Sequence, residues 1–211
     1  MTEQLMTARI TLHEYAPSGN CYKIRLTAAH LGVTLERRHY EIGAGETRTA
    51  AFLATVNANG RIPVLEVDGR FLPESNAACF YLADGTPLIP ADRWDRADML
   101  RWMFWEQYHH EPNIATLRFW RAFLGEDRLT DAQRGQLPTK KAAGEEALRL
   151  MDEHLATRDW LTGDRFSLAD IALYAYTHVA EEGGFDLPRY PAVGAWLARV
   201  ADQPGHVTLT A

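Results

Sequence analysis

A proline inside an apolar, β-forming run is the feature that most constrains the fold of this chain. The run reads Gly-Arg-Ile-Pro-Val-Leu-Glu-Val over residues 60–67. Proline cannot donate to the ladder of a central strand, so we expect Pro63 at the very start of a strand. A cis Ile62–Pro63 bond would leave the backbone of Ile62 available to another partner. Asp68-Gly69 is a two-residue hairpin signal, and residues 70–72 fit the returning strand.

A polar pair opens the next helix. Glu74 and Ser75 follow Pro73 and precede an apolar helix predicted over residues 76–83. A helix N-terminus offers unpaired amides and the positive end of the helix dipole, which favour a carboxylate. The local chemistry therefore indicates a small acidic peptide as ligand. The alternative is that Glu74 and Ser75 only cap the helix.

The remaining pattern divides the chain into two parts. Tight turns, alternation and helical spacing predict a β-α-β-α-β-β-α order, and the closing hairpin makes the four-stranded sheet mixed. The earlier elements of this part are expected at residues 9–15 (strand), 21–31 (helix), 33–42 (strand) and 49–54 (helix). Two prolines and a glycine within residues 84–90 indicate a linker. Only helices are expected beyond it, at 92–123 with a kink at Pro112, 140–157, 168–181 and 193–201.

Bulk properties narrow the class of protein. Twenty-two basic and 28 acidic residues give a net charge of −6, which argues against a nucleic-acid partner or an anionic membrane. No apolar run reaches the length of a bilayer-spanning helix, and the first residues lack the pattern of a secretory signal. The two cysteines, Cys21 and Cys79, provide neither a disulfide framework nor a metal cluster. A reducing cytoplasm is the expected location.

Residues 12–83 resemble the N-terminal, thioredoxin-like domain of the soluble glutathione transferases, and the helical remainder fits that family more loosely. The resemblance implies a thioredoxin-like α/β domain (1–84), a linker (85–91) and an all-α domain (92–211). It also implies a cytoplasmic, detoxifying homodimer that uses glutathione as co-substrate and needs no metal. In that family the proline-led strand, here Ile62-Pro63, pairs with the cysteinyl backbone of glutathione. The Glu-Ser pair, here Glu74-Ser75, holds the γ-glutamyl end.

The thiol of glutathione must be activated, because a cysteinyl thiol ionises only near pH ~8.5. A hydrogen-bond donor and a helix N-terminus lower such a pKa, and the turn Ser18-Gly19-Asn20-Cys21 offers both. The resemblance to serine-type members (theta, delta, zeta) makes Ser18 the catalytic hydroxyl, with Asn20 as the alternative donor. Asn20 stands where the beta class has its cysteine, and Cys21 lies one residue later, about 100° around the helix. Serine and asparagine are also common turn residues without a catalytic role.

Two further groups of residues complete the expected site. Arg48 and Arg61 are the candidates for the glycyl carboxylate, with His39 a weaker one, and Asn76 stands where the delta class has an arginine. Tyr108 and His109 align with positions that reach the active site in beta-class members. Most aromatics of this helix are expected in a domain or dimer core. Glu106 and His110 share a helical face, but two ligands alone make a poor metal site.

The predicted activity is attack of bound glutathione thiolate on a small apolar electrophile. One alternative is a glutathione-dependent peroxidase, disulfide reductase, lyase or isomerase that uses the same thiolate. Another is a non-catalytic protein that keeps the fold and binds glutathione or other ligands. The sequence leaves both alternatives open.

Overall fold

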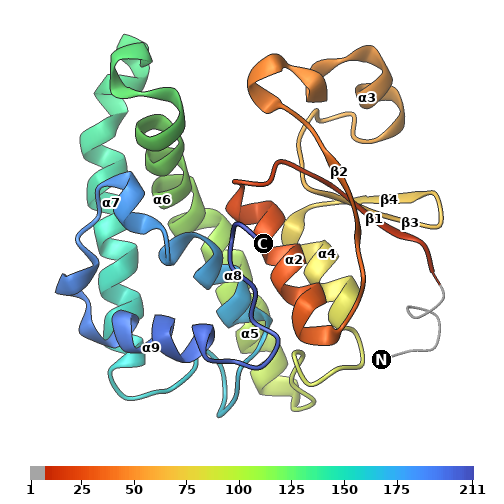
Figure 1. The fold of residues 1–211 in the computed structure, drawn as a ribbon. Helices are drawn as coiled ribbons and strands as arrows, with labels where there is room; N and C mark the ends of the chain where they lie inside the picture. Colours follow the sequence, from red (N-terminus) through yellow and green to blue (C-terminus); the bar gives the residue numbers. More distant parts are fainter. Residues whose placement is uncertain (1–7) are drawn as a thin grey trace. The chain divides into compact units, whose positions relative to one another are not determined.

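The computed structural model describes residues 8–211, which form two compact units (Figure 1). The first unit comprises the residues up to Ile89 together with Pro204–Ala211, and the second comprises Pro90–Gln203. Residues 204–211 were expected in the helical part of the chain. They belong to the first unit because polar side chains there bind their carbonyls, for example Tyr22, whose hydroxyl donates to Val207 O at 2.6 Å.

A mixed four-stranded sheet organises the first unit, as the sequence predicted. Its strands are β1 (Ile10–Glu14), β2 (Glu36–His39), β3 (Val64–Val67) and β4 (Arg70–Pro73), in the order β2-β1-β3-β4. The β1–β2 pair is parallel and the other two pairs are antiparallel. The tight Asp68-Gly69 turn joins β3 to β4, since both residues adopt positive φ angles.

Helices lie on both faces of this sheet. The cross-strand pairs Leu12↔Leu65 and Leu65↔Leu72 place these leucines on one face, against α2 (Gly19–Leu31) and α4 (Ser75–Ala83), which pack together. Figure 1 shows α2 and α4 running side by side. The helix α2 ends at Gly32, whose φ of 64° is the left-handed cap conformation that glycine adopts readily.

The opposite face of the sheet carries a polar and aromatic cluster. Buried His13 hydrogen-bonds Tyr40 OH through Nδ1 at 2.8 Å and the Glu66 carboxylate through Nε2 at 2.9 Å. The Tyr40 ring packs edge-on against Phe52 of α3 (Ala50–Thr55). Both ring nitrogens of the buried imidazole therefore have partners, and the cluster connects the sheet to α3.

The second unit is helical. Its helices are α5 (Arg93–Trp105), α6 (Glu111–Arg118), α7 (Asp131–Leu155), α8 (Leu168–Thr177) and α9 (Pro191–Ala201). Within residues 8–211, no helix has both the length and the apolarity needed to cross a bilayer.

The helix expected over residues 92–123 differs from the prediction. A π-helical turn, Glu106–His110, separates α5 from α6, and a second one, Phe119–Leu124, follows α6. Pro112 lies in the first turn of α6, where the wider turn before it accommodates a residue without an N–H. The next helix, α7, begins nine residues earlier than expected. Thr130 and Gln133 form a capping box there, and α7 then continues through Pro138.

A buried carboxylate holds the second unit together. Asp170 is 0% exposed and accepts four hydrogen bonds: from Ser167 N and Oγ (2.9 and 3.1 Å), Leu161 N (3.1 Å) and Trp196 Nε1 (2.9 Å). The bonds from Ser167 form the capping box at the start of α8, and the indole belongs to α9. One side chain therefore fixes the start of α8, the preceding loop and α9.

We predict that Asp170→Asn lowers the free energy of unfolding by about 2–4 kcal/mol, measured by urea unfolding. An amide has one acceptor oxygen instead of two, so its NH2 group would face the Ser167 donors. Asp164→Asn is the matched control, because the Asp164 side chain is 87% exposed and should change stability by less than about 0.5 kcal/mol. Equal stabilities for the two variants would contradict this account of Asp170.

The wild-type protein and Asp170→Asn also test how stability depends on pH. Burial raises the pKa of Asp170 to about 6, against the lowering effect of its four donors. An unfolded aspartate titrates near pH ~3.9, so between about pH 4 and 6 the folded protein retains a proton that the unfolded chain has lost. The contribution of Asp170 to the free energy of unfolding therefore falls as pH rises through this window. The difference in free energy of unfolding between the wild-type protein and Asp170→Asn should therefore shrink from pH ~4 to pH ~6.

Candidate functional site

The turn between β1 and α2 presents Ser18 at a helix N-terminus. Ser18 is the N-cap of α2, and its Oγ accepts a long 3.4 Å hydrogen bond from Cys21 N. The side chain is half-buried, and within residues 8–211 its hydroxyl proton has no acceptor. A serine in this position can donate to an anion near the α2 N-terminus, where the helix dipole adds to the stabilisation.

The neighbouring thiol cannot serve as the anion. Cys21 is 0% exposed, and its Sγ accepts from Tyr15 N at 3.4 Å. Burial raises the pKa of Cys21 to about 12, so it remains a protonated thiol at neutral pH. Cys21 and Cys79 are both buried, and they do not form a disulfide with each other.

The N-termini of α2 and α4 meet through two of the predicted site residues. Ser75 Oγ donates to Asn20 Oδ1 at 3.3 Å, and Ser75 is buried as the first residue of α4. Glu74 is exposed, with a φ of 74° that is uncommon for a residue other than glycine. Its side chain makes no capping hydrogen bond, so the reading of Glu74 as a helix-capping carboxylate is wrong. Its carboxylate is left to solvent or to a ligand.

The predicted cis bond is present at Ile62–Pro63, and the ladder of β3 begins directly after it, where Val64 pairs with His13 and Pro73. Pro63 is buried and Ile62 is half-buried. Pro63 thus precedes the paired part of the strand, as the sequence predicted for a residue that cannot donate to the ladder.

Two arginines lie near the loop that leads into this proline: Arg48 ends the 3-10 turn before α3, and Arg61 lies in the loop after α3. Exposed Arg48 donates through Nη1 to Asn59 O at 3.1 Å, and Asn57 Nδ2 donates to Arg61 O at 2.9 Å. Gly60 permits this arrangement: it has a φ of 64°, and a Cβ there would lie 2.5 Å from Arg48 Nη1. The loop therefore places the Arg48 guanidinium against the backbone that precedes Ile62–Pro63.

The remaining sequence candidates lie elsewhere. Tyr108 and His109 belong to the second unit, on the π-helical turn Glu106–His110, and the Tyr108 side chain is 81% exposed. His39 Nδ1 lies 3.5 Å from the Glu14 carboxylate, so the imidazole belongs to a different cluster. Among residues 8–211, no three histidine, cysteine, aspartate or glutamate side chains gather as metal ligands would.

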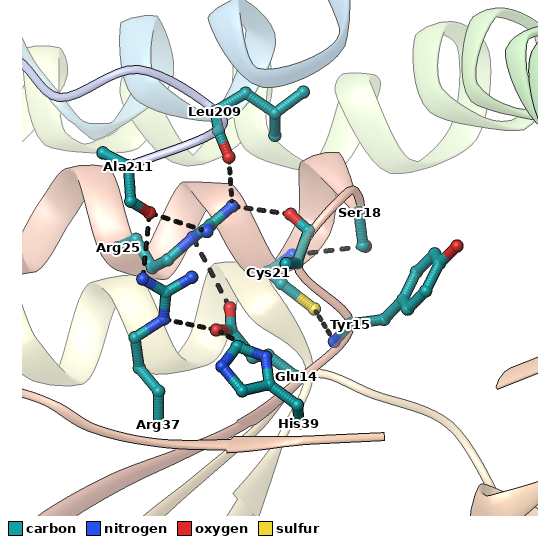
Figure 2. Close-up of polar contacts among 10 residues, drawn as sticks. Glu14, Tyr15, Ser18, Cys21, Arg25, Arg37, His39, Leu209 and Ala211 are labelled. Atoms are coloured by element: carbon teal, nitrogen blue, oxygen red, sulfur yellow. Dashed lines mark hydrogen bonds and ion pairs between the residues drawn. The ribbon is translucent and has the colours of Figure 1, made fainter. Parts of the chain in front are cut away.

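The cluster around Glu14 lies next to the Ser18 turn, and the sequence analysis did not predict it. Glu14, at the end of β1, is 0% exposed and forms ion pairs with Arg25 of α2 and with Arg37 of β2. Figure 2 shows the carboxylate facing both guanidinium groups, with His39 beside them. A charged residue at the end of the first strand was the available signal, because such a residue needs a partner wherever it is buried.

Comparison with known proteins identifies the family. Residues 8–84 match the Glutathione S-transferase, N-terminal domain, and residues 113–204 match the Glutathione S-transferase, C-terminal domain. The crystal structure of glutathione S-transferase from Pseudomonas fluorescens Pf-5 superposes with a TM-score of 0.91 at 45% identity, covering 96% of this chain and all of that one. The chain belongs to the glutathione S-transferase family.

Two curated relatives have different names. A Glutathione S-transferase-like protein LUC7 from a Fusarium species is 30% identical, covering 90% of this chain and 88% of the relative. Disulfide-bond oxidoreductase YfcG of Escherichia coli is 26% identical, covering 90% and 89% respectively. The relatives therefore share the family without sharing one named reaction.

We predict that Cys21 in the native protein resists alkylation by iodoacetamide at pH ~8, because its thiol is buried and protonated. Labelling should become fast in denaturant, when burial no longer raises the pKa. Mass spectrometry of the Cys21 peptide provides the measurement, and free glutathione in the same tube is the reactive control. Native labelling of Cys21 as fast as that of glutathione would overturn this assignment.

Proposed function

We propose that this protein is a glutathione transferase in which Ser18 stabilises the thiolate of bound glutathione. The observation that carries the proposal is the Ser18 hydroxyl, which caps α2 and has no acceptor for its proton within residues 8–211. A thiolate beside it would receive the O–H hydrogen bond and the favourable field of the helix N-terminus. Asn20, whose Oδ1 already accepts from Ser75, is the second candidate donor, through its amide nitrogen.

The ends of the tripeptide have matching groups in the first unit. Glu74, which makes no capping bond, and Ser75 would bind the γ-glutamyl amine and carboxylate at the α4 N-terminus. The backbone of Ile62, just before the strand ladder, would pair with the cysteinyl unit, and Pro63 holds it in place. Arg48 and Arg61 would receive the glycyl carboxylate.

The chemistry is a nucleophilic substitution or addition. Bound glutathione loses its thiol proton to solvent, and the resulting thiolate forms a C–S bond to an electrophilic carbon. In a substitution, the leaving group departs with its bonding electron pair. Ser18 lowers the cost of forming the thiolate and needs no change in its own covalent bonding. In the second unit, exposed Tyr108 and His109 are the proposed contacts for an apolar electrophile.

Disulfide reduction is the second candidate function, favoured by the similarity to the oxidoreductase YfcG. The same thiolate would attack a sulfur of a disulfide, form a mixed disulfide and release a thiolate. Assays with a chloronitrobenzene electrophile and with a mixed disulfide of glutathione separate the two reactions. A protein that binds glutathione and turns over neither substrate class would fit a non-catalytic binding role instead.

We also propose that the protein acts as a cytoplasmic homodimer. Support for self-association comes from two large aromatic side chains on α5 that are mostly exposed, Trp94 and Phe104. Aromatic residues are enriched in the cores of protein–protein interfaces.

We predict that Ser18→Ala lowers kcat/KM for conjugation by roughly tenfold or more and raises the pKa of the bound glutathione thiol. Thiolate absorbance near 240 nm, followed against pH, reports that pKa. Ser18→Thr retains a hydroxyl and should keep most of the activity, whereas Cys21→Ala should leave the thiol pKa unchanged. Loss of activity in Asn20→Ala with full activity in Ser18→Ala would transfer the role to Asn20.

We predict that Arg48→Ala weakens glutathione binding by roughly five- to thirtyfold, equivalent to about 1–2 kcal/mol, because the glycyl carboxylate loses a cationic partner. Calorimetry with glutathione and with its glycyl monoethyl ester isolates that carboxylate, since the ester should bind both proteins alike. Arg70→Ala, at another exposed arginine of the same unit, is the control. Equal loss of affinity for both ligands would exclude Arg48 as the carboxylate partner.

A further inference from the structure

The last eight residues of the chain run along α2 as a strap. His30 hydrogen-bonds Pro204 O through Nδ1 at 2.8 Å, Tyr22 OH donates to Val207 O at 2.6 Å, and Arg25 Nη2 donates to Leu209 O at 2.9 Å. The close approach is visible at Gly205, where a Cβ would lie 3.1 Å from Ala29 O. The strap (Pro204–Ala211) is thus fixed to successive side chains of one helix, the helix that Ser18 caps.

Arg25 connects the strap to the Ser18 turn. The same Nη2 that donates to Leu209 O also donates to Ala16 O at 2.8 Å, and Nη1 donates to the backbone oxygen of Ala211 at 3.3 Å. Ala16 lies two residues before Ser18, inside the turn. Figure 2 shows the Arg25 guanidinium reaching the oxygens of Leu209 and Ala211, on the same side of α2 as Glu14.

A buried carboxylate holds this guanidinium in place. Arg25 is almost fully buried, and its Nε lies 3.5 Å from the Glu14 carboxylate, which is also paired with Arg37. Arg37 Nη1 donates to the oxygen of Ala211 at 2.9 Å. The end of β1, the start of β2, α2 and the strap therefore share one charge network. A buried network of this kind has few alternative arrangements, because each broken contact leaves an uncompensated charge.

We propose that Arg25, held by the strap and by Glu14, is a positioning residue that sets the Ser18 turn through the carbonyl of Ala16. This inference rests on the proposed role of Ser18 in activating glutathione. Arg25 is separated from the reacting sulfur by the turn itself and acts only through the backbone that carries Ser18. A small displacement of a donor aimed at a thiolate weakens its stabilisation steeply. Arg25 and residues 208–211 thereby influence the thiol pKa without contacting glutathione.

Two changes break the connection from opposite sides. Arg25→Lys retains a positive charge for Glu14, but one ammonium cannot reproduce the planar, forked donors that reach Ala16, Leu209 and Ala211 together. Deletion of residues 208–211 leaves Arg25 intact and removes the two strap oxygens that it binds. We expect either change to raise the pKa of the bound glutathione thiol by about half a unit to one unit and to lower kcat about three- to tenfold. The Kd for glutathione should stay within about twofold, since the groups that bind its ends are elsewhere.

The double variant shows whether Arg25 and residues 208–211 act on the same turn. When Arg25→Lys is combined with the deletion, the thiol pKa should move no further than in either single variant. Hydrogen exchange of the peptide covering residues 15–22 should be faster in all three proteins, which tests the position of the turn without any ligand.

His30→Ala is the matched control, because it removes a strap contact at the far end of α2 and should leave the thiol pKa and the exchange of the turn unchanged. If Arg25→Lys and His30→Ala lose stability alike and neither moves the thiol pKa, Arg25 is only structural and the inference is wrong. Additive shifts in the double variant would also overturn it. If the wild-type protein itself fails to lower the glutathione thiol pKa, the proposed function falls, and this inference falls with it.

Discussion

The first unit depends on a carboxylate that has no access to water. Ionised Glu14 at the end of β1 would be prohibitively costly alone, and it is compensated by Arg25 from α2 and Arg37 from β2. Both arginines also bind the oxygen of Ala211. Compensation of one buried charge thus aligns three consecutive elements, β1, α2 and β2, and the turn with Ser18 lies directly between the first two.

In the second unit, neutral donors stabilise a buried carboxylate. Within residues 8–211 Asp170 forms no ion pair; its four hydrogen bonds come from the backbone, a hydroxyl and an indole. These bonds compensate the carboxylate only in part, because burial still raises its pKa to about 6. In both units a buried carboxylate gives directionality to packing that apolar contacts alone would not specify.

The candidate site combines features with different physical origins. The N-termini of α2 and α4 supply the positive ends of two helix dipoles at Ser18 and Ser75. A strand start supplies the backbone around Ile62, and a glycine turn admits the Arg48 side chain beside Asn59. The sheet and its hairpin hold these parts in a fixed relation. Donors and positive charge lie at the ends of elements, where the small acidic peptide of the proposed function could approach.

Local residue patterns were enough to predict the mixed sheet, its proline-led strand and the hairpin, because proline, Asp-Gly and alternation restrict the backbone locally. The capping box at Ser167 and Asp170 is equally local, since that motif spans only four residues. Three features became visible only in the folded protein: α7 continues past Pro138, a π-helical turn follows Trp105, and residues 204–211 pack on α2. Each of these depends on partners far along the chain: Arg25 meets Leu209 across 184 positions, and no local pattern records which carbonyl a buried guanidinium will bind.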